Sequence, residues 1–162
     1  MNAKDAIKYS LDSNFEIMKT FLNDLSDADL LVRPVPGANH AAWQIGHLIA
    51  SEVGLLAGAG GIPAPLPAGF AEKHSKATAS IDSPSAFLTK AQYLDLYDKV
   101  RAATLASLDK LAEADLDKAS AASIAAYAPT VAIAYLIMGS HIMMHAGQFT
   151  VLRRKLGKPV LF

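Results

Sequence analysis

The chain has 162 residues, of which 52% are apolar and 19% charged, a composition that supports a large core and excludes a disordered chain. Its formal net charge is zero and no basic patch stands out, so the electrostatic footprint of a nucleic-acid-binding protein is missing. There are no cysteines, which excludes disulfides, thiolate ligands and a cysteine nucleophile. This length is typical of one domain, and we expect residues 1–162 to form a single domain.

The first part of the chain predicts two helices of different character. Residues 3–25 carry apolar side chains at intervals of three and four, with charged residues between them, which predicts an amphipathic helix. Residues 33–37 (Arg-Pro-Val-Pro-Gly) interrupt the chain, because proline disfavours helix at and before itself. We expect Asn39 to cap a second helix over residues 40–57. Its only formal charge is Glu52, which is either exposed or a hydrogen-bond acceptor near a site.

A long connection follows the second helix. Residues 58–69 are rich in glycine and proline and predict irregular structure, which continues to about Asp82. A crossover of this length would let the next helix run parallel to its predecessor. The alternative is a flexible linker between two helical halves. His74 lies in a charged part of this segment, and we expect it to be solvated.

Two further helices complete the predicted fold. Ser83 and Pro84 are expected to begin a third helix that ends near Leu111, because serine caps a helix and proline suits its first turn. Its expected buried stripe is Phe87, Ala91, Leu94, Leu105, Leu108 and Leu111. A fourth helix is expected over residues 130–156, with Gly157 ending it. The predicted fold is therefore all-α, a four-helix bundle with a long crossover between helices 2 and 3.

The C-terminal part of the chain also has a stretch without formal charge, residues 119–152, that is long enough to span a bilayer. Pro129, Gly139 and several polar residues interrupt it, and a helix enclosed in a bundle gives the same pattern. We therefore expect no membrane insertion. The N-terminus lacks the apolar core of a signal peptide, so a cytoplasmic location is expected.

Histidines on the two uncharged helices are the candidates for chemistry. His141 and His145 are four residues apart, so in a helix both project from one face and can bind one metal ion. His47 lies on the other uncharged helix, and three imidazoles would leave an open coordination position, as in catalytic metal sites. The alternative is that these are core or interface histidines satisfied by hydrogen bonds.

Other residues near these histidines are weaker candidates. Gln148 and Gln44 are the candidate catalytic residues: each could hydrogen-bond a ligand histidine or a bound water, or could be a helix-packing amide. His40 is expected to have a capping or surface role, or to lie at the outer edge of a pocket. Met143 and Met144 are expected to be core residues that point away from the imidazoles.

Taken in order, these features resemble the DinB/YfiT-like superfamily of four-helix-bundle proteins. The resemblance rests on Arg33-Pro34 before the helix with His47, on the crossover, and on residues 141–148 (His-Ile-Met-Met-His-Ala-Gly-Gln). It implies a divalent metal, nickel or zinc, bound by His47, His141 and His145. It also implies a homodimer. Some relatives transfer low-molecular-weight thiols to electrophiles or isomerise thiol adducts, and many have no assigned activity.

The chain departs from this family at one position. Many members have an acidic residue directly after the first histidine of the last motif, where this chain has Ile142. The motif is also not His-Glu-x-x-His, so the general base of a zinc peptidase is missing from its usual place. The paired Glu and Glu-x-x-His of a di-iron bundle are absent as well.

Two hypotheses follow from the sequence. The first is a metal-dependent enzyme of the hydrolase or thiol-transferase type that acts on a small-molecule substrate. The second is a non-catalytic helical dimer that binds a small apolar ligand or a partner protein, and Ile142 is its best support. The substrate, the identity of the metal and the dimer interface are open.

Overall fold

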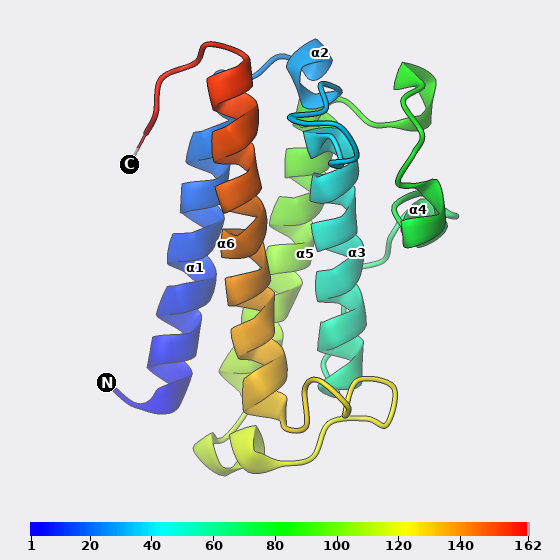
Figure 1. The fold of residues 1–162 in the computed structure, drawn as a ribbon. Helices are drawn as coiled ribbons and strands as arrows, with labels where there is room; N and C mark the ends of the chain where they lie inside the picture. The colour runs from blue at the N-terminus through cyan, green and yellow to red at the C-terminus, as the bar shows by residue number, and fades with distance from the viewer. Residues whose placement is uncertain (162) are drawn as a thin grey trace.

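Four long helices form a bundle in the computed structural model, which describes residues 1–161 (Figure 1). They are α1 (Ala3–Leu22), α3 (Ala41–Gly58), α5 (Lys90–Lys110) and α6 (Val131–Lys155). The short helices are α2 (Asp27–Leu30) and α4 (Phe70–Lys73), together with the 3-10 turns η1 (Lys76–Thr78), η2 (Pro84–Ala86) and η3 (Glu113–Asp117). No strand occurs in this part of the chain, so the predicted all-α bundle is confirmed.

The long helices form a ring. Helix α6 lies between α1 and α3, and α5 completes the ring by contacting α1 and α3 as well. In Figure 1, α1 and α6 run in one direction, while α3 and α5 run in the other. The segment between α3 and α5 returns along the length of the bundle, as expected for a crossover between parallel helices. Helices α3 and α6 are consequently antiparallel neighbours. Within residues 1–161, no helix has the length and apolar character needed to cross a membrane.

Two helix starts differ from the prediction. Helix α3 is capped by His40 instead of Asn39, because His40 Nδ1 accepts a hydrogen bond of 3.1 Å from the backbone N–H of Trp43. Helix α5 begins at Lys90, seven residues after Ser83. The reciprocal capping bonds that begin it are made by Thr89 and Gln92.

The buried face of α5 also differs from the predicted apolar stripe. It consists of Tyr93, Tyr97, Val100, Arg101, Thr104 and Leu108, of which the prediction included only Leu108. The reason lies on α3, where Glu52 is buried. One carboxylate oxygen of Glu52 accepts from Arg101 Nη2 at 2.7 Å and the other from Thr104 Oγ1 at 2.8 Å. Polar residues therefore occupy the α3–α5 interface because a buried carboxylate needs partners.

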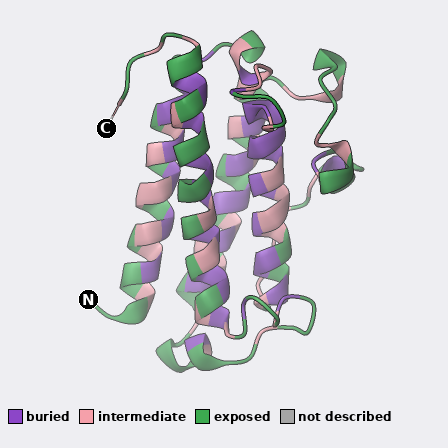
Figure 2. Cartoon of the chain, in the orientation of Figure 1, coloured by how far each residue is buried: buried purple, intermediate pink, exposed green. Residues whose placement is uncertain are grey.

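The crossover is packed against α3, which argues against a flexible linker. His74 is buried, contrary to the prediction that it is solvated. Its Nδ1–H donates to the Phe70 carbonyl at 2.8 Å, and its Nε2 accepts from the Tyr93 hydroxyl at 2.7 Å. The His74 ring fits because position 46 is glycine: a Cβ there would lie 2.1 Å from its Cδ2. Figure 2 shows the buried positions on the inward faces of the long helices.

Candidate metal centre

The three histidines singled out by the sequence lie together in the middle of the bundle. His47 comes from α3, and His141 and His145 come from α6. One ring nitrogen from each lies within 4.8 Å of the other two. The ring centroids are 5.1 Å apart for His47 and His141, 5.6 Å for His47 and His145, and 4.9 Å for the pair on α6. The antiparallel packing of α3 on α6 thus joins residues from opposite ends of the chain.

Gln44 fixes the orientation of His145. The Gln44 amide N–H donates to the Asn39 carbonyl at 2.6 Å, which turns the amide oxygen toward α6. That oxygen lies 2.8 Å from His145 Nδ1. Because an amide oxygen can only accept, Nδ1 carries the proton and the Nε2 lone pair is left available. His145 Nε2 then faces His141 Nε2 at 3.2 Å.

Trp43 holds the third ring. The indole of Trp43 is stacked on His47, with centroids 5.0 Å apart and an interplanar angle of 6°. Trp43 is itself buried and its Nε1–H donates to Thr78 Oγ1 of the crossover at 3.3 Å. The orientation of His47 therefore depends on the crossover as well as on α3.

Burial keeps the three imidazoles neutral. Burial, with a smaller contribution from the neighbouring histidines, lowers the pKa of His141 to about 4 and that of His145 to about 3. Burial is also the largest cause that lowers the pKa of His47; a hydrogen bond to the His74 backbone opposes it, and the charge of Lys76 adds to it. All three rings are thus in the form that binds metals near pH 7.

The cluster could hold a metal ion. Two nitrogens on a tetrahedral zinc, each ~2.0–2.1 Å from the metal, are about 3.3 Å apart, close to the observed 3.2 Å between the two Nε2 atoms. Neutral imidazoles suit zinc, nickel, copper and iron. Three such ligands would leave at least one coordination position for a water or a substrate atom.

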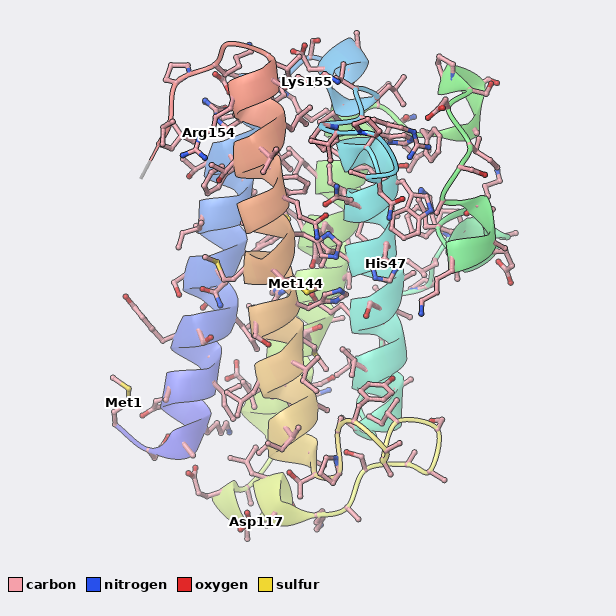
Figure 3. The ribbon with its side chains drawn as sticks, in the orientation of Figure 1. Met1, His47, Asp117, Met144, Arg154 and Lys155 are labelled. Atoms are coloured by element: carbon pink, nitrogen blue, oxygen red, sulfur yellow. The ribbon has the colours of Figure 1, made fainter. Side chains whose placement is uncertain are left out.

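A pocket of about 570 Å³ opens beside His141. It is lined by Ser51, Leu55, Lys76, Tyr127, Ile137, Ser140, His141 and Met144. Met144 is exposed and faces this pocket, and Met143 is also exposed, so the prediction that both are core residues was wrong. Figure 3 shows Met144 on α6 at about the level of His47 on α3.

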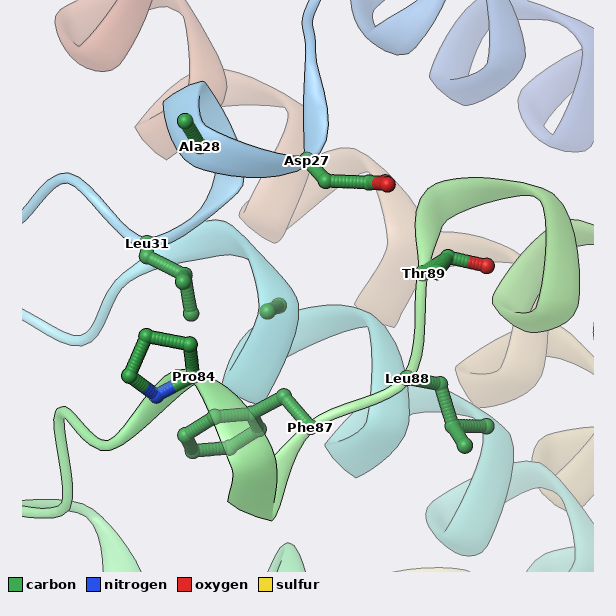
Figure 4. Close-up of a pocket in the computed structure, with 8 residues that line it drawn as sticks. Asp27, Ala28, Leu31, Pro84, Phe87, Leu88 and Thr89 are labelled. Carbon is green, nitrogen blue, oxygen red and sulfur yellow. The ribbon is translucent and has the colours of Figure 1, made fainter.

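A second pocket, of about 300 Å³, lies between α2 and the start of α5 (Figure 4). It is lined by Asp27, Ala28, Leu31, Ala42, Pro84, Phe87, Leu88 and Thr89. Its single carboxylate belongs to Asp27, which accepts a hydrogen bond from the backbone N–H of Lys90 at 2.6 Å. That carboxylate has a structural role at the start of α5, and none of the three clustered histidines lines this pocket.

The remaining candidates lie in different surroundings. Gln148 is exposed, whereas Gln44 is buried against His145. His40 is buried, and its Nε2–H donates to the Ile81 carbonyl at 3.0 Å, so its role is to cap α3 and tie it to the crossover. Ile142 belongs to the core of the bundle, so the position at which the resemblance implies an acidic residue is here a packing position. Sequence reasoning missed the pocket residues Lys76 and Tyr127, because Lys76 lies in the short turn η1 and Tyr127 in the connection before α6, where no periodicity marks them.

Comparisons with known proteins agree with this architecture. The family described as the DinB superfamily matches residues 10–149, a range that includes all three histidines. A DinB-like protein from Bacillus cereus ATCC 10987 is 21% identical, with a TM-score of 0.70 over 98% of this chain and 97% of that one. A conserved protein from Enterococcus faecalis is 16% identical, with a TM-score of 0.66 over 98% and 99%. At these identities the two structures show the fold alone. No curated protein matches.

Proposed function

This chain belongs to the DinB superfamily, and on that basis we propose that it is a metal-dependent enzyme of the hydrolase or thiol-transferase type. The observation that carries the proposal is the set of three neutral imidazoles within 4.8 Å of one another at the edge of an open pocket. We propose His47, His141 and His145 as the ligands, and nickel or zinc as the metal.

The chemistry follows from the charge of the site. When bound, a divalent metal on three neutral ligands would lower the pKa of a coordinated water or thiol and favour the nucleophilic form. Gln44 and Trp43 keep two of the ligand rings in place. The hydroxyl groups of Ser51 and Tyr127 line the pocket, where they can donate hydrogen bonds to a small substrate. The Ser140 hydroxyl, which donates to the Ile137 carbonyl at 3.3 Å, can accept one there.

Metal analysis tests this proposal. The protein is purified without chelator, incubated with zinc or nickel, desalted and measured by elemental analysis; we expect one metal per chain. His47→Ala and His141→Ala should lose the metal while keeping the circular dichroism spectrum of a helical bundle. His40→Asn, which retains a capping side chain on the same helix, should keep it. Absence of metal from the wild-type protein after loading would refute the proposal.

We also propose a homodimer, and an observation on α6 supports it. Large apolar side chains are exposed along the outer side of this helix, namely Ile133, Leu136, Met143 and Val151. No charged residue occurs between positions 119 and 152. An uncharged, apolar helix face of this kind is typical of a protein–protein contact.

A further inference from the structure

Lys76 is the one charged side chain among the described residues that line the pocket beside His141, whose own ring is neutral. Leu55, Ile137 and Met144 give this pocket an apolar wall, and the other lining residues contribute hydroxyl groups. Among residues 1–161, no carboxylate lies within 4.0 Å of the Lys76 ammonium. Within the described part of the chain, the Lys76 ammonium at this pocket therefore has no carboxylate partner.

The backbone around Lys76 is anchored on both sides. Two residues earlier, His74 is buried against Gly46 and bonded to Tyr93. Two residues later, Thr78 Oγ1 contacts the Ser75 carbonyl at 2.9 Å and accepts from Trp43 Nε1 at 3.3 Å. These contacts fix the backbone of the turn η1, from which the exposed Lys76 side chain lines the pocket.

We propose that Lys76 is a specificity-determining residue that selects substrates carrying a carboxylate. The substrate's carboxylate pairs with the Lys76 ammonium, its carbon chain lies on Leu55 and Ile137, and its reacting group faces the three histidines. A carboxylate fits better than a phosphate because a single lysine is present, without the arginine fork or helix N-terminus that typically holds phosphate. This inference rests on the proposed metal site, because the reacting group is positioned there.

A binding experiment with simple thiols tests the inference without knowledge of the reaction. The protein is loaded with cobalt(II), whose absorption reports first on metal binding and then on thiolate coordination. Mercaptoacetate, mercaptopropionate and mercaptohexanoate are titrated, each against the mercapto-alcohol of the same chain length. For at least one length we expect the acid to bind roughly three- to tenfold more tightly than the alcohol, as for a partly screened ion pair.

Two variants isolate the lysine. Lys76→Met should abolish the preference for the acid and leave the affinity for the alcohol unchanged. Lys73→Met is the matched control: this lysine is exposed in the same crossover, does not line the pocket, and its removal should leave the preference intact. Added salt should reduce the wild-type preference.

The outcomes separate the two proposals. If cobalt and thiols bind but the wild-type protein prefers no acid, or if Lys76→Met keeps the preference, the role of Lys76 is overturned and the metal site stands. If cobalt does not bind, the metal-site proposal fails before any thiol is added, and the inference about Lys76 fails with it.

Discussion

Gln44 joins the start of α3 to His145 through two hydrogen bonds, which makes it the residue most directly able to tune the proposed ligand set. Gln44→Leu removes the acceptor of the His145 Nδ1 proton and leaves that proton unsatisfied in a buried position. We expect metal affinity to fall by roughly 10- to 100-fold, the usual cost of losing such a supporting bond. Competition titration against a chromophoric chelator measures this change.

The control for Gln44→Leu is Gln148→Leu, which replaces an exposed amide on α6. We expect its metal affinity to match that of the wild-type protein. Equal losses of affinity in the two variants would contradict the role given to Gln44.

The buried histidines predict how stability depends on pH in the metal-free protein. The pKa of His145 is about 3 in the folded state because of burial, and about 6.5 in the unfolded chain. Below pH 6.5 the unfolded state therefore binds more protons than the folded state. The contribution of His145 to the free energy of unfolding is complete above pH 6.5 and is lost as the pH falls from there toward 3. For His145 alone the loss between pH 6.5 and 5 is at most about 2 kcal/mol.

Urea denaturation of metal-free protein at pH 7.5, 6.5 and 5 measures the effect. His145→Gln, first shown to be folded at pH 7.5, should have a shallower loss of unfolding free energy over the same range. A slope identical to that of the wild-type protein would show that His145 is protonated in the folded state or that the site is open to water.

At the residue scale, the clustered histidines could be predicted because the pattern that marks them lies within a few neighbouring positions of the sequence. The spacing of His141 and His145 and the uncharged helix around His47 are visible in the sequence alone. The contacts that orient these rings are not visible there, since Gln44 and His145 are 101 positions apart. His74 was misjudged for the same reason: its charged neighbours suggested solvent, whereas the glycine that admits its ring lies on α3.

At the scale of elements, the contact between the crossover and α3 depends on Gly46. Gly46→Ala would place a Cβ 2.1 Å from the His74 ring, which must then leave its position between Phe70 and Tyr93. We expect a loss of about 1–3 kcal/mol in the free energy of unfolding, as for other overpacked sites. Urea denaturation at neutral pH measures it.

The matched control is Gly54→Ala on the same helix, where an added Cβ meets no atom within 4 Å. This substitution should stabilise the protein by up to about 1 kcal/mol, because alanine is the better helix former. A Gly46→Ala variant as stable as Gly54→Ala would mean that the crossover does not pack on α3 as described.

The buried face of α5 could not be predicted from the spacing of its apolar residues. The apolar residues near its C-terminal end, such as Leu105 and Leu111, suggested one face, and the bundle buries another that includes Arg101 and Thr104. Periodicity counts apolar residues and cannot anticipate that Glu52 of a different helix requires polar partners. The ends of α1 and α6 were predicted to within three residues, since caps and stop signals are local.

At the scale of the whole molecule, the outer face of α6 predicts association. We expect the wild-type protein to sediment as a dimer at micromolar concentration, and Leu136→Glu to shift it toward monomer, because a charge would be buried in the contact. Ile62→Glu, which adds the same charge at an exposed apolar position outside α6, should remain dimeric. Analytical ultracentrifugation distinguishes these cases, and a monomeric wild-type protein would refute the proposed face.

The joining of α3 to α6 through histidine rings has a further consequence once a metal is loaded. The ion would then be a reversible cross-link between α3 and α6, in a chain that has no cysteines to form a disulfide. Ligands that bind only the native state stabilise it in proportion to the logarithm of their free concentration. The free energy of unfolding would accordingly rise and fall with the concentration of free metal around the protein. The fraction of folded chains would therefore depend on how much metal is available.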